Sequence, residues 1–219
     1  MTRRFALIVF DWDGTLLDSE QQIVDCMFAT CAELALAAPE RDTIRNTIGL
    51  GLPEALEMLF PGGRGGLHGR ITETYRRHFL ANRTPAPLFP GAAQTVTALS
   101  EAGYLLGVAT GKSRRGLQRA LTETGLGPLF HGTRCADESF SKPHPQMLLD
   151  LMDTLGAEPA ETLMVGDTEY DMQMAANAGT AALGVNYGAH DRSRLLAHGP
   201  LACIDAIADI KQWLADHAD

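Results

Sequence analysis

Short runs of apolar residues recur along the chain, separated by stretches in which apolar residues return every three or four positions. The short runs predict buried strands at 5–10, 104–110, 132–135, 162–167 and 181–185. Runs without polar alternation are typical of strands covered on both faces, as in a parallel sheet. The helical spacing predicts helices at about 92–101, 114–124, 145–155 and 171–178, and a last helix near 202–215. This alternation predicts an α/β fold with a doubly wound, Rossmann-like parallel sheet.

The segment from 18 to 84 differs because no strand pattern interrupts it. Helical spacing predicts four helices there, with Ser19 able to cap the first and Pro39 in the first turn of the second. A glycine-rich link at 61–66 precedes the last of these helices, and proline-rich residues from 84 to 90 lead back. We therefore expect two domains. Residues 1–17 and 85–219 form the core, and 18–84 form a small inserted helical domain.

Composition restricts the partners of the chain. A net charge of −9 over 219 residues argues against nucleic acid or an anionic membrane surface, because both bind basic patches. No apolar run approaches the roughly 18 residues of a membrane helix. The four cysteines form no CxxC pair and are too sparse for a disulfide framework, which favours the reducing cytoplasm. We expect a monomer or a homodimer.

The first predicted strand ends in acidic residues. Asp11 closes the apolar run and Asp13 follows it, directly before Gly14. Open α/β sheets bind their ligands at the carboxyl ends of their strands, and two carboxylates this close repel each other unless a cation neutralises them. Mg²⁺, which prefers oxygen ligands, is the simplest such cation. The alternative is a solvated Asp-Gly turn. An EF-hand calcium loop is excluded because Gln22 stands where that loop needs Glu.

Polar residues also follow later strands. They are Thr110, Gly111 and Lys112 after the second strand, and Asp167 and Asp171 after the fourth. Lys142 lies between them in a loop that two prolines restrict. Plainer interpretations exist, because Thr110 could cap the next helix and Asp171 could be a first-turn acid favoured by the helix dipole. The order and placement of these residues nevertheless predict that they converge on one cleft.

These motifs together resemble those of the haloacid dehalogenase superfamily, in its phosphatase branch, over essentially the whole chain. The four motifs are Asp11-Trp12-Asp13-Gly14-Thr15, Thr110, Lys142, and Gly166-Asp167 with Asp171. The resemblance implies that residues 1–17 and 85–219 are the family's Rossmann-like catalytic core. It also implies that residues 18–84 are its small helical cap.

The resemblance further implies a Mg²⁺-dependent phosphatase that works through an aspartyl-phosphate. Asp11 would attack the phosphorus, and Asp13 would protonate the leaving oxygen and then deprotonate the attacking water. Thr110 and the amide of Gly111 would bind phosphoryl oxygens, while Lys142 would balance the charge of the carboxylates and of the transition state. The metal ligands would be the Asp11 carboxylate, the Asp13 main-chain carbonyl and Asp167, with Asp171 in support, either directly or through water.

Within the family, three segments are most similar to phosphoglycolate phosphatases. They are Ile48-Gly49-Leu50-Gly51, Lys142-Pro143-His144-Pro145 and Val185-Asn186-Tyr187-Gly188. The partner implied is a small phosphorylated metabolite, with phosphoglycolate first and other small esters and pyrophosphate after it. The cap loop that would touch the leaving group contains Gly49, Leu50, Gly51 and Glu54. Arg45 and Arg83 could meet an anionic leaving group, although exposed helix arginines are the plainer interpretation.

Several alternatives stay open at this point. A phosphosugar mutase of the same family would use the same two aspartates, although the cap loop lacks the arginine that such mutases carry. A catalytically silent binding protein on the same fold is the alternative outside enzymology. A dehalogenase is disfavoured because Asp13 supplies an acid/base that such enzymes lack. A phosphate-binding P-loop is disfavoured because three residues, where four are needed, separate Gly107 from Gly111.

Overall fold

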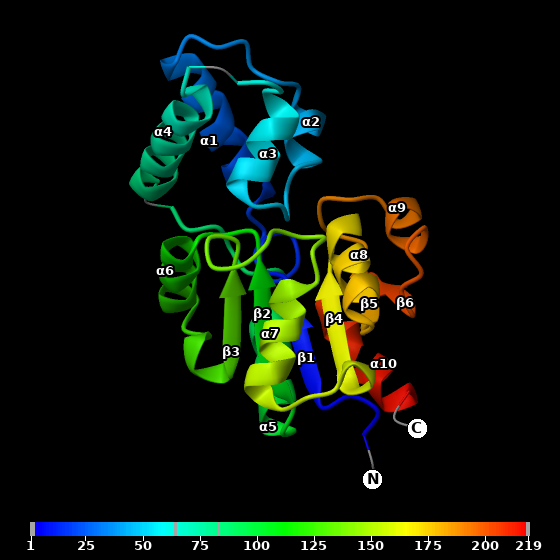
Figure 1. Cartoon of the computed structure of the whole chain (residues 1–219). Coiled ribbons are helices and arrows are strands. Elements are labelled where there is room, and N and C mark those ends of the chain that lie inside the picture. Colours follow the sequence, from blue (N-terminus) through cyan, green and yellow to red (C-terminus); the bar gives the residue numbers. More distant parts are fainter. Residues whose placement is uncertain (1–2, 64, 83, 218–219) are drawn as a thin grey trace.

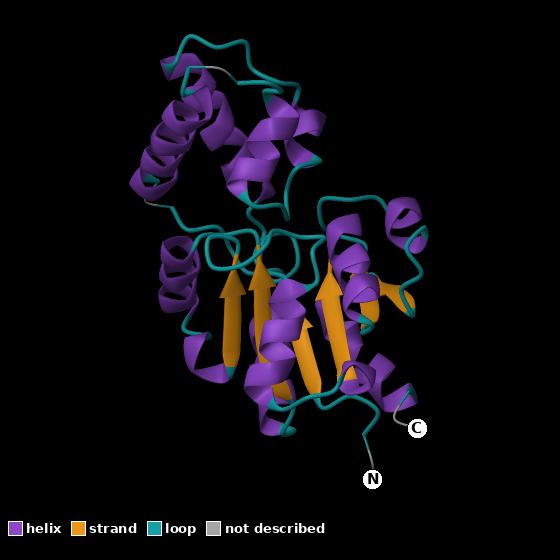
Figure 2. Cartoon of the chain, in the orientation of Figure 1, coloured by secondary structure: helices purple, strands orange, loops and turns teal. Residues whose placement is uncertain are grey.

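The computed structural model describes residues 3–63, 65–82 and 84–217. Six parallel strands form one sheet in the order β3-β2-β1-β4-β5-β6 (Figures 1 and 2). The strands are β1 Leu7–Phe10, β2 Leu105–Thr110, β3 Gly132–Cys135, β4 Thr162–Gly166, β5 Ala181–Val185 and β6 Ala202–Ile204. From β1 the chain builds outward through β2 and β3 on one side and through β4 to β6 on the other. The direction reverses between β1 and β4, which is where open α/β sheets bind ligands.

Both faces of the sheet are covered by helices. Along β1, Ile8 and Phe10 point into one apolar cluster, while Leu7 and Val9 point into another. The first cluster is closed by α5 (Ala92–Glu101), α6 (Arg114–Thr124) and α10 (Ile210–Asp216). The second is closed by α7 (Gln146–Leu155) and α8 (Glu169–Ala178). Because every residue of β1 is buried, its run reads as continuously apolar, and the predicted doubly wound parallel sheet is confirmed.

Four helices form a separate bundle above the carboxyl ends of the strands (Figure 1). They are α1 Glu20–Glu33, α2 Arg41–Arg45, α3 Leu52–Leu59 and α4 Leu67–Ala81. The bundle has its own apolar core, which includes Val24, Leu56 and Ile71. Its two connections to the sheet domain lie side by side, because Leu17 pairs with Leu88 as an antiparallel bridge. Paired connections restrict how the bundle can tilt over the sheet.

The structure corrects the sequence-based expectations at three places. The helix expected at 202–215 is wrong in its first half, where β6 pairs with β5 and the helix α10 begins only at Ile210. A three-residue edge strand is too short to display a period of its own. The short helix α9 (Arg192–Leu196) was not predicted. Pro39 precedes α2 by two residues, so it is not in the first turn of that helix.

Within the described residues, no helix has the length and apolar character needed to cross a bilayer.

Candidate active site

Three carboxylates and one lysine meet at the switch point of the sheet. Asp11 follows β1, Asp167 follows β4, and Asp171 lies in the first turn of α8. Each offers a carboxylate oxygen, and these oxygens lie within 4.8 Å of one another in the buried interior. Lys142 reaches them from the loop before α7, with its Nζ 2.6 Å from Asp11 Oδ1 and 2.6 Å from Asp171 Oδ1. The structure therefore brings together the four residues that the sequence singled out from three separate motifs.

Hydrogen bonds fix the orientation of the two acids that follow β4. Asp167 accepts from the Thr15 hydroxyl at 2.8 Å and from the Ala189 amide at 2.7 Å. Asp171 forms a capping box with Thr168, whose amide and hydroxyl donate to Asp171 Oδ2 at 3.0 and 2.7 Å. The interpretation of Asp171 as a first-turn acid is thus correct but incomplete, because its other oxygen faces Lys142.

Glycines leave the room that these acids occupy. A Cβ added to Gly188 would lie 2.2 Å from the Asp167 Cβ, and one added to Gly14 would lie 2.1 Å from Asp167 Oδ2. Gly14 also has a φ of +86°, which other residues rarely adopt. A Cβ added to Gly166 would lie 2.3 Å from the Asp171 Cγ. The acidic cluster is therefore enclosed by backbone on several sides, and any side chain at these positions would displace it.

Asp13 lies beside this cluster in a different environment. Its Oδ1 lies 2.8 Å from Lys112 Nζ and accepts from the Ser19 hydroxyl at 2.5 Å. Ser19 stands at the N-cap of α1, but its side chain makes no capping bond, so the predicted capping role is wrong. The sequence placed Lys112 with Thr110 and Gly111 at a strand end facing the cleft but gave it no role, and the Lys112–Asp13 pair was missed. The available signal was a basic residue immediately after the second motif.

Thr110 is the last residue of β2, and Gly111 follows it on the side that faces the bundle. The buried Thr110 hydroxyl accepts from the Lys112 amide at 3.2 Å, and the helix α6 is capped by Ser113 instead. The interpretation of Thr110 as a helix cap is therefore wrong. A Cβ on Gly111 would lie 2.3 Å from the Leu50 carbonyl oxygen, so the loop between α2 and α3 packs directly on Gly111.

Burial makes the charge state of the cluster unusual. Burial raises the pKa of the Asp11 carboxyl well above its ordinary value, although Lys142 acts in the opposite direction. Burial, with the charge of Asp171, raises the pKa of Asp167 to about 7. Burial disfavours the charged form of Lys142, but the carboxylates of Asp11 and Asp171 more than offset this and raise the pKa of Lys142. When all are ionised, three carboxylates face one ammonium, which leaves an excess of two negative charges.

The residues fit a divalent metal ion. Asp11 Oδ2 is buried and has no hydrogen-bond donor among the residues that the structure describes. Asp167 supplies a second buried carboxylate nearby. Carboxylate oxygens in a cluster with two excess negative charges are the ligand chemistry that Mg²⁺ prefers. In contrast, both oxygens of Asp171 already have partners in Thr168 and Lys142.

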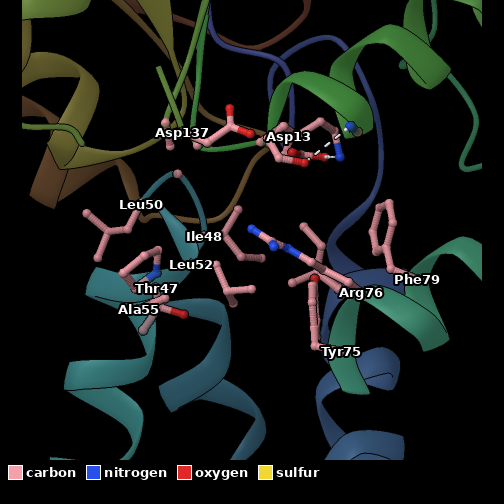
Figure 3. Close-up of a pocket in the computed structure, with 18 of the residues that line it drawn as sticks. Asp13, Thr47, Ile48, Leu50, Leu52, Ala55, Tyr75, Arg76, Phe79 and Asp137 are labelled. Atoms are coloured by element: carbon pink, nitrogen blue, oxygen red, sulfur yellow. Dashed lines mark hydrogen bonds and ion pairs between the residues drawn. The ribbon is translucent and has the colours of Figure 1, made fainter. Parts of the chain in front are cut away.

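A cavity of about 360 Å³ opens from Asp11 and Asp13 into the bundle (Figure 3). Of the predicted cap loop, Gly49 and Leu50 line this cavity. The Gly51 amide donates to Ser141 Oγ at 2.8 Å, which ties the loop to the segment that carries Lys142. Glu54 is exposed, and its carboxylate lies over Gly51 outside the cavity lining.

Polar contacts on both sides hold the bundle over the cavity. On one side, the Tyr170 hydroxyl donates to the Asn46 carbonyl at 2.9 Å, and Arg194 donates to Asn46 Oδ1 at 2.7 Å. On the other side, Arg119 of α6 donates to the Leu80 and Asn82 carbonyls at the end of α4, at 3.1 and 2.8 Å. The bundle and the sheet domain are therefore docked around the cavity.

Two arginines were considered as contacts for an anionic leaving group. Arg45 is engaged elsewhere, because it donates to Glu20 at 2.9 Å and to the Gly188 carbonyl at 3.0 Å. Arg83 lies outside the described residues.

Comparison with known proteins decides the family. The sequence model of the family described as Haloacid dehalogenase-like hydrolase matches residues 8–185, which is most of the chain. The chain belongs to this family. It is a hydrolase, and residues of its first, third and fourth motifs meet in the acidic cluster.

Relatives and solved structures agree with this assignment. The chain is 35% identical over 209 residues to a protein of Dickeya dadantii named Probable phosphatase IndB, covering 93% of this chain and 91% of that one. It is 33% identical over 219 residues to the phosphoglycolate phosphatase of Rhodospirillum rubrum, covering 94% and 90%. A crystal structure described as a predicted phosphoglycolate phosphatase from Haemophilus somnus superposes with a TM-score of 0.85 at 26% identity, covering 96% and 98%.

The raised pKa of Asp167 predicts how metal-free protein responds to pH. Folded Asp167 binds its proton up to about pH 7, whereas the unfolded carboxyl releases it near pH 4, so stability is lost as the pH rises through this window. We expect the melting temperature without metal to fall between about pH 4 and about pH 7, and Mg²⁺ to remove most of that fall. Thermal unfolding over this pH range, in EDTA and in Mg²⁺, measures the fall without metal and the fall with metal. In Asp167→Asn the fall should be shallower, and an equal fall in that variant would contradict the assignment.

The close packing of Gly188 on Asp167 predicts a second effect. Gly188→Ala should lower the free energy of unfolding by about 1–3 kcal/mol, because the new methyl group overpacks the site, and should weaken stabilisation by Mg²⁺. Gly69→Ala in α4 is the control. Nothing lies within 4 Å of its added Cβ, so it should stabilise by up to about 1 kcal/mol. Urea denaturation with and without Mg²⁺ distinguishes the two, and a Gly188→Ala protein that matches the wild type would refute the packing argument.

Proposed function

We propose that the protein is a Mg²⁺-dependent phosphatase that hydrolyses a small organic phosphate monoester through an aspartyl-phosphate on Asp11. The observation that carries this proposal is the cluster of three buried carboxylates around Lys142, which opens beside Asp13 into a ligand-sized cavity. The two relatives described above are named phosphatases, which supports the same reaction class. Phosphoglycolate is the first candidate substrate from resemblance.

Asp11 is proposed as the nucleophile. Its carboxylate is fixed by Lys142 through Oδ1, which leaves Oδ2 free of hydrogen-bond donors among the described residues. Attack by this oxygen on phosphorus divides one difficult displacement into two easier ones. Lys142 compensates negative charge as the phosphoryl group is transferred, and Thr110 with the Gly111 amide is proposed to hold its oxygens.

Asp13 is proposed as the general acid and base. Its carboxylate lines the cavity, and Oδ1 is held by Lys112 and Ser19. Both of these contacts are made by Oδ1, so Oδ2 is the oxygen proposed to give a proton to the leaving oxygen. The same oxygen can then accept a proton from the water that releases phosphate from Asp11.

The proposed metal ligands are the carboxylates of Asp11 and Asp167 and the main-chain carbonyl of Asp13. Bound there, Mg²⁺ would lower the repulsion between the anionic nucleophile and the phosphate. Asp171 is proposed in support, because Thr168 and Lys142 already occupy its two oxygens.

The domain division is part of the proposal. Residues 1–17 and 85–219 act as the catalytic core, and residues 18–84 act as a cap that closes over the substrate and excludes water. The cap loop of Gly49, Leu50, Gly51 and Glu54 is proposed to select the leaving group, with Gly49 and Leu50 at the cavity wall. The four cysteines are free thiols in the structure, which supports the cytoplasm as the proposed compartment.

The test is phosphate release from a panel of small esters, with pyrophosphate included, in the presence and absence of Mg²⁺. We expect release that requires Mg²⁺ and that falls at least about 10³-fold in Asp11→Asn, because the nucleophile is removed. Asp153→Asn is the matched control, since this exposed aspartate of α7 lies away from the cavity lining and should change nothing.

Other outcomes separate the alternatives. Full activity in Asp11→Asn would refute the mechanism. Conversion of a sugar phosphate to its isomer without phosphate release would favour a mutase. Mg²⁺ binding without turnover of any ester would favour a silent binding protein.

A further inference from the structure

The cavity is larger and more apolar than a glycolate group requires. Its volume of about 360 Å³ lies in the range of pockets that hold complete organic ligands, roughly 300–1,000 Å³. Its wall on the bundle side is mostly aliphatic and aromatic, with Ile23, Met27, Ile44, Ile48, Leu52 and Phe79 among the lining residues. A two-carbon polar leaving group would leave most of this apolar surface in contact with water.

Aromatic rings form one side of the cavity. Tyr75 and Phe79 lie one turn apart on α4, and their rings stack with centroids 6.0 Å apart. Lys112 Nζ lies 4.8 Å from the centre of the Phe79 ring, so this wall continues to the ion pair with Asp13. A flat apolar group attached to the phosphoryl oxygen would therefore find a matching surface directly beyond Asp13.

One charged side chain of the bundle, that of the exposed Arg76, extends over this apolar space. Figure 3 shows Arg76 of α4 reaching across the cavity between Ile48 and Tyr75, toward the side where Asp13 lies. In the part of the chain that the structure describes, no carboxylate lies within ion-pair distance of Arg76. Arg115 of α6 also lines the cavity, from the sheet side. The other basic side chain of the lining, Lys112, is already paired with Asp13.

We infer that the substrate is a phosphate monoester whose leaving group has an apolar body larger than glycolate and a carboxylate that Arg76 binds. This inference rests on the proposed reaction, and it replaces phosphoglycolate, the candidate that came from resemblance, with a larger substrate. The apolar body contacts the bundle wall, which removes apolar surface from water. The carboxylate pairs with a guanidinium whose planar fork suits it, at the exposed edge of the cavity.

The test compares two aryl esters of nearly equal shape, para-carboxyphenyl phosphate and para-carboxamidophenyl phosphate. For the wild type we expect kcat/KM to favour the carboxylate ester by about 10–100-fold, as a charge-assisted hydrogen bond implies. In Arg76→Met this ratio should fall close to one while the carboxamide ester is still hydrolysed. Phosphoglycolate should bind Asp11→Asn protein more weakly than the carboxylate ester, by about tenfold or more, because it leaves the apolar wall uncovered. Binding is compared here because an aryl group also leaves more readily than an alkyl group.

Arg70→Met is the matched control, because Arg70 lies on the same helix, is exposed and is outside the cavity lining. It should retain the wild-type ratio. An equal ratio in the wild type and Arg76→Met would overturn the inference, as would loss of the preference only in Arg115→Met or a clear preference for phosphoglycolate.

Binding separates failure of this inference from failure of the proposed function. Calorimetry with both esters on Asp11→Asn protein, with and without Arg76→Met, measures the carboxylate preference without turnover. A preference that depends on Arg76 supports the inference even if no ester is hydrolysed. Equal binding of the two esters to both proteins overturns it, whether or not the enzyme is a phosphatase.

Discussion

The structure depends on keeping like charges together in its buried interior. Asp11, Asp167 and Asp171 are buried around one lysine, and an unpaired buried charge is costly. Each part of the surrounding structure reduces that cost. Thr15 and Ala189 donate to Asp167, Thr168 donates to Asp171, and Lys142 lies between two carboxylates. What these groups leave uncompensated is negative charge, which a divalent cation would neutralise.

The fold supplies this arrangement from the geometry of the sheet. Because β1 and β4 are parallel neighbours in register, the residues that follow them emerge at the same edge. Close approach of the backbone then requires glycine, as at Gly14 and Gly188, where any Cβ would meet Asp167. The same edge faces the bundle, whose loop packs on Gly111. Burying these like charges costs free energy, and contacts from the sheet, from the loops that follow its strands and from the bundle together keep the site in place.

The predictable part of this structure came from patterns that are local in sequence. The run before Asp11 is apolar because both faces of β1 are covered. The strand and its end could therefore be located from the order of apolar and polar residues alone. The role of Lys142 could be assigned only through the family resemblance, because its partners Asp11 and Asp171 lie in other motifs far along the chain. The family model confirms the resemblance itself, while the roles of the individual residues stay predictions.

The unpredicted part depends on contacts between distant segments. The pairing of Lys112 with Asp13 joins residues about a hundred positions apart, and nothing local distinguishes Lys112 from a solvated lysine. Ser19 resembles a helix cap in sequence, yet its hydroxyl donates to Asp13. Arg76 is one of several basic residues on α4, and only the packing of α4 over the sheet makes it a cavity residue. The strand β6 escaped notice because three residues at a sheet edge carry too little pattern.

The central claim is that Asp11 itself carries the phosphoryl group during turnover. The most direct measurement is mass spectrometry of Asp13→Asn protein that has been mixed with Mg²⁺ and a good ester and then quenched in acid. Because Asp13 is needed to activate the hydrolytic water, this variant should accumulate one phosphoryl group on the peptide that contains Asp11. Steady phosphate release with that peptide unmodified at every time point, in a variant whose Asp11 is intact, would contradict the account.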